Sequence, residues 1–179
     1  MAQEAWYRLS LAQVAFVPAA RNPLKDDPRD ETTDAHRLNM LRLAVGDDAR
    51  FRVDPTELRR GGLSYTIDTL RRYADKYEPG ELYSVMGSDA ALTLPQWKDV
   101  ELYGGLCTVV VCNRPGEADF SQGLPAEMRS LGLRFEFMPL PPLDVSATEI
   151  RRRVRQGKPV RYFVPDSVAG YIHEHGVYR

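Results

Sequence analysis

The sequence predicts an α/β fold in which a mostly parallel sheet carries helices on both faces. Short β-rich runs alternate with longer helical patterns, and alternation at this spacing is typical of parallel sheets. The chain also opens with a helical segment that leads into a buried strand, which is the second half of a βαβ unit. Because ligands bind at the carboxyl ends of parallel strands, we expect the functional residues in the loops there.

The predicted elements follow in order from the N-terminus. Residues 2–11 indicate a helix, residues 14–17 a buried strand, and the segment from Pro18 a loop. The runs after this loop alternate between the two patterns: DAHRLNMLRLAV, FRVDPTEL, SYTIDTLRRYADKY, ELYSVMG, PQWKDVELYGG, CTVVVC and RFEFMPL. The segment NRPGEADFSQGLPAE is interpreted as a surface excursion. Two further helical segments close the sequence, SATEIRRRVRQG and PDSVAGYIHEHGVY.

Length and charge limit the class of protein. A chain of 179 residues suits one domain, large enough to bury about two-thirds of the surface that its unfolded form exposes. Its 24 Lys and Arg against 25 Asp and Glu give a net charge of -1, which argues against charge-driven binding to nucleic acid. Apolar stretches such as CTVVVC are far shorter than the ~20 residues that span a bilayer, and no continuous apolar signal segment is present. We therefore expect a cytoplasmic protein that binds neither nucleic acid nor membranes.

The two cysteines are expected to be reduced core residues. Cys107 and Cys112 lie five apart on a predicted strand, so their side chains point to opposite faces of the sheet. Side chains on opposite faces cannot form a disulfide with each other.

The stretch LDVSATEIRRRVRQG carries helix signals at both ends. Ser146, with Glu149 three residues later, matches a capping box, and Val145 with Ile150 matches the hydrophobic staple that accompanies it. Gly157 suits the position just beyond the end of a helix. The sequence therefore predicts a helix that starts after residue 146 and ends before residue 157.

This helix offers polar groups that suit a polyphosphate. Ile150 and Val154 lie four apart on the inward face, while Arg151 and Arg155 lie four apart on another face. The N-terminal amides, two hydroxyls and a guanidinium thus fall within about one and a half turns, and all favour negative charge. The alternative from this stretch alone is a well-capped surface helix with solvated arginines.

Three other segments also allow a structural and a functional interpretation. In GLSYTIDTL, Ser64 or Thr66 could cap the following helix. Trp97, in PQW, could be a partly buried core aromatic. MGSDA ends a strand in two small residues and an acid, which suits close approach of a nucleotide, although Asp89 could instead cap the next helix.

The remaining basic and imidazole groups carry weaker signals. Lys25 lies in the loop after VAFVP, and Arg114 follows the strand TVVVC; each could be solvated or could contact phosphate. His173 and His175 are two residues apart, which does not place both on one helix face, so a metal site there is not expected. His36 begins a helix and is expected to make a local contact.

Taken together, seven segments of this sequence resemble the bacterial nicotinate-nucleotide adenylyltransferases. In order they are VAFVPAARNPLK, HRLNMLRLA, ELRRGGLSYTIDTLR, YSVMGSDAALTLPQWKDVE, VVVCNRPG, LPPLDVSATEIRRRV and RYFVPDSVAGYIHEHGVY. The resemblance implies a Rossmann-like, doubly wound nucleotidyltransferase fold. It also implies transfer of the adenylyl group of ATP to nicotinate mononucleotide, giving deamido-NAD and pyrophosphate with Mg²⁺. ATP and nicotinate mononucleotide are the expected partners, and formation of a homo-oligomer is left open.

The resemblance assigns five residues to ATP. Ser146, Thr148 and Arg151 stand where the family's second ATP-binding motif stands, which implies contacts with the phosphates. Gly87 and Asp89 stand in the strand-end motif, where the family implies a close approach of backbone and a contact with ribose hydroxyls.

Five more residues are assigned by resemblance to nicotinate mononucleotide. The SYT turn with Ser64 and Thr66 presents the threonine backbone amide to the substrate carboxylate. Trp97 becomes the stacking platform for the pyridine ring, a contact worth on the order of 1 kcal/mol beyond burial. Lys25 and Arg114 become phosphate partners. Tyr171 and Tyr178 are interpreted as packing residues.

The sequence departs from the family pattern at its beginning. Family members carry a first strand and a turn of the form GxFxPxHxGH, whose histidines contact the ATP phosphates, and no histidine here matches them. The catalytic residues therefore stay unassigned. We expect Met1 to be an internal methionine and the domain, residues 1–179, to be N-terminally incomplete. Lack of a central first strand would leave two neighbouring strands with unpaired backbone groups.

Two other functions are compatible with the sequence. The first is adenylyl transfer to a different phosphorylated acceptor, such as nicotinamide mononucleotide or phosphopantetheine. The second is a non-catalytic module that binds nucleotides, which would follow if the chain truly starts at Met1. Trp97 and the SYTIDTL turn favour a pyridine nucleotide as the acceptor.

Overall fold

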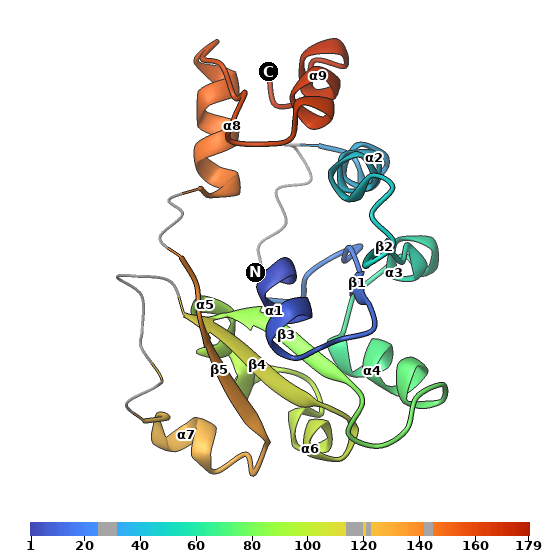
Figure 1. Cartoon of the computed structure of the whole chain (residues 1–179), viewed down its shortest axis with the longest axis vertical. Helices are drawn as coiled ribbons and strands as arrows, with labels where there is room; N and C mark the ends of the chain where they lie inside the picture. The colour runs from blue at the N-terminus through green and yellow to red at the C-terminus, as the bar shows by residue number, and fades with distance from the viewer. Residues whose placement is uncertain (25–31, 114–119, 121–122, 142–144) are drawn as a thin grey trace. The chain divides into compact units, whose positions relative to one another are not determined.

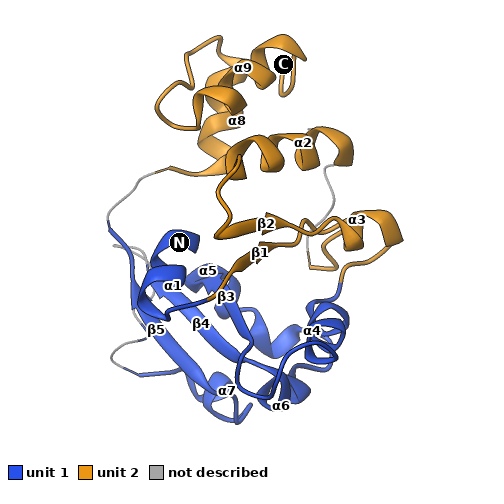
Figure 2. Ribbon diagram, turned by 45° about the vertical axis from the view of Figure 1, so that its right-hand side comes forward, with its two compact units in different colours: residues 1–11, 65–143 blue, residues 12–64, 144–179 orange. Residues whose placement is uncertain are grey.

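A computed structural model describes residues 1–24, 32–113, 120, 123–141 and 145–179 of the chain (Figure 1). The chain divides into two compact units, each made from two separate stretches (Figure 2). Unit 1 comprises residues 1–11 and 65–143, and unit 2 comprises residues 12–64 and 144–179.

Unit 1 contains a three-stranded parallel sheet. Its strands are β3 (Tyr83–Gly87), β4 (Thr108–Asn113) and β5 (Phe135–Pro139), in the order β3-β4-β5. The middle strand reads TVVVCN, a nearly continuous run of apolar residues. Such a run is expected of a strand that is buried on both faces.

Helices cover both faces of this sheet, as the sequence predicts. Val109 and Val111 of β4 join a cluster with residues from α4 (Thr66–Ala74), α5 (Ser88–Ala91), α6 (Tyr103–Leu106) and α7 (Ala126–Arg129). The alternate residues Val110 and Cys112 join a second cluster, to which α1 (Ala2–Arg8) contributes Ala5. The period-2 alternation of β4 thus supplies both cores.

The cysteines lie as the sequence predicts. Both are buried and free, with Cys107 in the first cluster and Cys112 in the second, on opposite faces of the sheet. Burial raises the pKa of the Cys107 thiol to about 11.

Unit 2 contains a βαβ arrangement. Strands β1 (Val14–Phe16) and β2 (Phe51–Val53) pair in parallel with Ala15 opposite Arg52, and the connection between them includes α2 (Asp34–Val45). The short helix α3 (Thr56–Arg60) follows β2. The last helices, α8 (Ala147–Arg155) and α9 (Asp166–Glu174), form a separate apolar cluster with Met40 of α2.

The α/β class and the parallel pairing are confirmed, but the described strands form two sheets and not one. β1 is paired with β2, and β3 with β4. The segment PQWKDVELYGG also differs from a single helix. It forms two 3₁₀ turns, η1 (Leu94–Gln96) and η2 (Val100–Leu102), followed by α6, because Pro95 lies within the first turn and Asp99 adopts a left-handed conformation with φ 51°.

Two smaller expectations are also corrected. Phe120, within the predicted surface excursion, is buried in the first core cluster and contacts Phe137 at a ring-centroid distance of 6.4 Å. His36 makes the expected local contact through its backbone N–H, which donates to the Thr33 hydroxyl at 3.3 Å, but its side chain makes a distant one: Nδ1 lies 2.9 Å from the hydroxyl of Tyr171, 135 positions away in the sequence. Tyr171 therefore does more than pack, whereas Tyr178 packs against the unit 2 core as predicted. No helix in the described part of the chain is long and apolar enough to cross a membrane.

Candidate functional site

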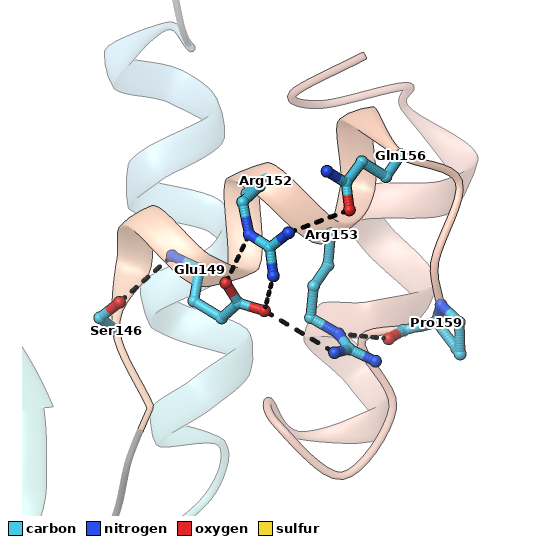
Figure 3. Close-up of polar contacts among 6 residues, drawn as sticks. All are labelled: Ser146, Glu149, Arg152, Arg153, Gln156 and Pro159. Carbon is cyan, nitrogen blue, oxygen red and sulfur yellow. Dashed lines mark hydrogen bonds and ion pairs between the residues drawn. The ribbon is translucent and has the colours of Figure 1, made fainter.

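The N-terminus of α8 is capped by a side chain, as predicted. The hydroxyl of Ser146 accepts a hydrogen bond from the backbone N–H of Glu149 at 3.2 Å (Figure 3). At the other end, Gly157 has a φ of 65°, which suits the residue after a helix. Val145 is exposed and is not among the described side chains that pack around the buried Ile150, so the predicted hydrophobic staple is not observed.

Only the Ser146 hydrogen bond of the predicted capping box is observed. The Glu149 carboxylate binds arginines of α8 and does not return to the backbone N–H of Ser146. Its oxygens accept hydrogen bonds from Arg152 at 2.7 and 2.8 Å, and Arg153 lies 3.7 Å away (Figure 3). The hydrogen bond from Arg152 lowers the pKa of Glu149. Arg153 also donates to the carbonyl of Pro159 at 3.0 Å. Arg152 and Arg153 are therefore both held by the Glu149 carboxylate.

Arg151 lies on the side of α8 that carries Thr148. Its Nη2 is 3.4 Å from the Thr148 hydroxyl, a long hydrogen bond. Ile150 is buried and Val154 packs against the same core cluster, which confirms the predicted inward face. Ser146, Thr148 and Arg151 thus occur together in the first turns of one helix, with the helix dipole favouring an anion.

At the end of β3, Gly87 leaves room for the side chain of Asp89. A Cβ atom at Gly87 would lie 2.7 Å from Oδ1 of Asp89, closer than such atoms approach in proteins. The next residue, Ser88, is fully buried, while Asp89 is exposed. No side chain caps α5, so the alternative in which Asp89 is a helix cap is wrong. Its carboxylate lies at the carboxyl end of a parallel strand, where ligands bind in such folds.

The turn before α4 is held by contacts of Ser64 with Ala20 and Arg21 and not by a capping side chain. The N-cap of α4 is Tyr65, without a side-chain hydrogen bond, so neither Ser64 nor Thr66 caps the helix. Ser64 is buried, and its hydroxyl accepts a hydrogen bond from the N–H of Ala20 at 2.9 Å. Thr66 is the first residue of α4, a position whose N–H has no partner within the helix.

Trp97 is partly buried against the unit 1 core, as its structural interpretation predicts. Its Nε1 donates to the hydroxyl of Thr93 at 2.9 Å. Its ring meets that of Tyr103 edge to face, with centroids 6.3 Å apart and an interplanar angle of 69°. Burial raises the pKa of Tyr103 to about 12, opposed by a hydrogen bond from the Thr66 side chain.

Tyr103 is a residue that sequence reasoning missed. Only 1% of it is exposed, and it is among the largest fully buried side chains. The sequence places it inside a helical pattern, where a tyrosine gives no local signal of its contacts. Its partners, Thr66 and Trp97, come from other segments and are visible only in the fold.

Two predicted phosphate partners, Lys25 and Arg114, lie outside the described residues. Among the described residues, no group of three or more His, Cys, Asp or Glu side chains could hold a metal ion.

The rings of Tyr171 and His175 lie 4.1 Å apart, and the hydroxyl of Tyr171 also accepts a hydrogen bond from Asn39 at 3.1 Å. The cluster around Tyr171 thus joins α2 to α9.

Comparison with known proteins gives consistent matches. Residues 1–153 match the family model described as cytidylyltransferase-like. The chain is 38% identical to a probable nicotinate-nucleotide adenylyltransferase of Roseiflexus sp. (strain RS-1), over 100% of this chain and 89% of the relative. It is also 38% identical to a probable nicotinate-nucleotide adenylyltransferase of Kineococcus radiotolerans, over 99% of this chain and 82% of the relative.

A solved structure shares the fold. The nicotinic acid mononucleotide adenylyltransferase of Plasmodium falciparum, complexed with NaAD, superposes with a TM-score of 0.68 at 15% identity, covering 93% of this chain and 82% of that one. This match confirms the Rossmann-like nucleotidyltransferase fold.

Proposed function

Because this chain belongs to the nicotinate-nucleotide adenylyltransferases, within the cytidylyltransferase-like proteins, we propose that its residues bind ATP and nicotinate mononucleotide to form deamido-NAD and pyrophosphate. The activity is that of a nucleotidyltransferase in NAD biosynthesis. The observation that carries this function is the identity of 38% along the whole chain.

The reaction needs positioning more than it needs a protein nucleophile. An oxygen of the mononucleotide phosphate attacks the α-phosphorus of ATP in line. The new P–O bond forms as the bond to the bridging oxygen of the β-phosphate breaks, and pyrophosphate leaves with that oxygen. Both reactants are polyanions, so the enzyme must orient them and neutralise the charge that develops on the leaving group.

The ATP phosphates are assigned to the start of α8. Ser146, Thr148 and Arg151 lie within its first turns, and helix N-termini with an arginine favour anions. Arg151 lies beside Thr148 on this helix, which supports Arg151 as the phosphate ligand. The hydroxyl of Ser146 already accepts from the helix, and its O–H is still a donor.

Gly87 and Asp89 are assigned to the ATP ribose. A glycine at the end of β3 leaves space for the Asp89 carboxylate, which would otherwise meet a Cβ atom. An exposed carboxylate can accept two hydrogen bonds from neighbouring ribose hydroxyls.

The acceptor nucleotide is assigned to the region around Thr66 and Trp97. The amide of Thr66, at the N-terminus of α4, suits a carboxylate, and Trp97, which is only partly buried, is assigned to the pyridine ring. Ser64, Lys25 and Arg114 complete the proposed set on the resemblance alone.

Mg²⁺ is proposed to arrive with ATP. Mg²⁺ keeps several waters and binds mainly through substrate phosphates with few protein carboxylates. The bound ion would neutralise phosphate charge during transfer, while Arg151 and the α8 amides hold the phosphates from the protein side.

The function is tested by offering the full chain MgATP with three acceptors. Nicotinate mononucleotide, nicotinamide mononucleotide and phosphopantetheine are compared for pyrophosphate release, and the products are identified by mass spectrometry. We expect deamido-NAD as the main product, with nicotinate mononucleotide giving the highest kcat/KM. A higher kcat/KM for another acceptor would contradict the assigned substrate, and ATP binding without pyrophosphate release would indicate a non-catalytic module.

A further inference from the structure

Tyr103 connects two groups that the proposed function assigns to the acceptor nucleotide. Its ring packs edge to face on Trp97, and the Thr66 side chain hydrogen-bonds to its hydroxyl. All three residues belong to unit 1, and the same core cluster contains Tyr103 with Ile67 of α4. A single buried side chain therefore contacts both the start of α4 and the indole ring.

Trp97 and the start of α4 are each held by a second contact besides Tyr103. The Trp97 indole is fixed at its other end by the hydrogen bond from Nε1 to Thr93 at 2.9 Å. Ile67, next to Thr66, is fully buried in the core. Rotation of the indole or tilting of the first turn of α4 would therefore break contacts with Tyr103.

We propose that Tyr103 is a positioning residue for the acceptor nucleotide, which fixes the Trp97 ring relative to the Thr66 amide. This inference rests on the proposed function, because it assumes that Trp97 and Thr66 contact the pyridine ring and its carboxylate. Tyr103 itself is too deeply buried to touch the substrate. It acts on the affinity for the mononucleotide and not on the binding of ATP.

The Y103F variant of the full chain tests the hydroxyl. This variant keeps the ring and removes the oxygen, so we expect KM for nicotinate mononucleotide to rise about 2- to 12-fold, the range of one hydrogen bond. KM for ATP and kcat should change by less than the KM for the mononucleotide. The matched control is Y83F, a tyrosine that packs against the second core cluster on the other face of the sheet, and it should leave all three constants unchanged.

Fluorescence of Trp97 tests the ring without relying on activity. The chain has two tryptophans, so Trp97 is observed alone in a W6F background. Replacing the ring in Y103L should increase quenching of Trp97 by acrylamide, whereas Y103F should not. Far-UV circular dichroism verifies that each variant is folded.

The outcomes separate the two proposals. Equal KM values for the mononucleotide in Y103F and Y83F, or an equal rise in KM for ATP, would overturn the role of the hydroxyl. Unchanged quenching in Y103L would overturn the positioning of Trp97. If the unmodified chain forms no deamido-NAD from MgATP and nicotinate mononucleotide, the proposed function fails, and the quenching data alone decide whether Tyr103 orders Trp97.

Discussion

The hydroxyl of Ser64 accepts a hydrogen bond from the backbone N–H of Ala20 at 2.9 Å, across 44 positions of sequence. The same serine donates its own N–H to the carbonyl of Arg21 at 2.8 Å, and Arg37 donates to the carbonyl of Ala19 at 2.7 Å. Hydrogen bonds thus connect the loop after β1 to the turn at Ser64, where the first stretch of unit 2 ends, and to Arg37 of α2. This places Ser64 in the framework of the loop, while its contact with the nucleotide stays a prediction.

The S64A variant should lower the free energy of unfolding by about 1–3 kcal/mol, because the partly buried N–H of Ala20 loses its acceptor. Urea denaturation followed by circular dichroism measures the change. The control is S167A, which removes an exposed hydroxyl that donates to Leu43 and should cost less than about 0.5 kcal/mol. Equal losses in the two variants would contradict a structural role for the Ser64 hydroxyl.

The G87A variant should impair ATP binding more than stability. The added methyl group would meet Oδ1 of Asp89, and this exposed side chain can rotate away at small cost in stability. Its displacement should raise KM for ATP toward the value of D89A. The double variant G87A/D89A should then lose little more than D89A alone, since both act through one carboxylate.

Steady-state kinetics of the three variants provide the measurement for Gly87. G105A is the matched control, because Gly105 has a helical position and no atom within 4 Å of its virtual Cβ. G105A should leave KM for ATP unchanged. Additive losses in G87A/D89A would show that Gly87 acts independently of Asp89.

The R151A variant should raise KM for ATP about 10-fold or more, the effect of removing a hydrogen bond to a charged group. R152A is the control on the same helix, because Arg152 is occupied by Glu149 at 2.7 Å. KM for nicotinate mononucleotide serves as an internal reference in both. A larger effect of R152A than of R151A would reassign the phosphate ligand.

Stability should fall with pH between about 9 and 11. Burial raises the pKa of Cys107 from 9.0 to about 11, so the folded state prefers the neutral thiol. The resulting stabilisation is fully present below pH 9 and is lost as pH rises through 11. Urea denaturation of C107A across this range should show a weaker pH dependence than the unmodified chain, and identical profiles would contradict the assignment.

Local signals in the sequence predicted local structure well. The N-terminus of α8 follows from the capping residue Ser146, which lies three positions before Glu149. The opposite faces of Cys107 and Cys112 follow from the period of a strand. Such features depend on neighbours in sequence, and so a pattern can reveal them.

Contacts between distant segments could not be predicted in the same way. Ser64 looked like a helix cap, but its partner Ala20 is brought to it by the fold. His36 and Tyr171 meet from α2 and α9, and Tyr103 meets Trp97 after two 3₁₀ turns that a helical pattern did not indicate. The family resemblance assigns Trp97 and Thr66 to the acceptor nucleotide but gives no indication of Tyr103, which contacts both.

The division of each unit into two stretches has a consequence for synthesis on the ribosome. Residues 12–64 emerge first, and their partners in unit 2, residues 144–179, follow only after residues 65–143. At typical elongation rates, this interval lasts roughly 4 to 16 s. During that time Met40 lacks the apolar side chains of α8 and α9 against which it packs. This side of α2 therefore stays uncovered by its unit 2 partners until translation is nearly finished.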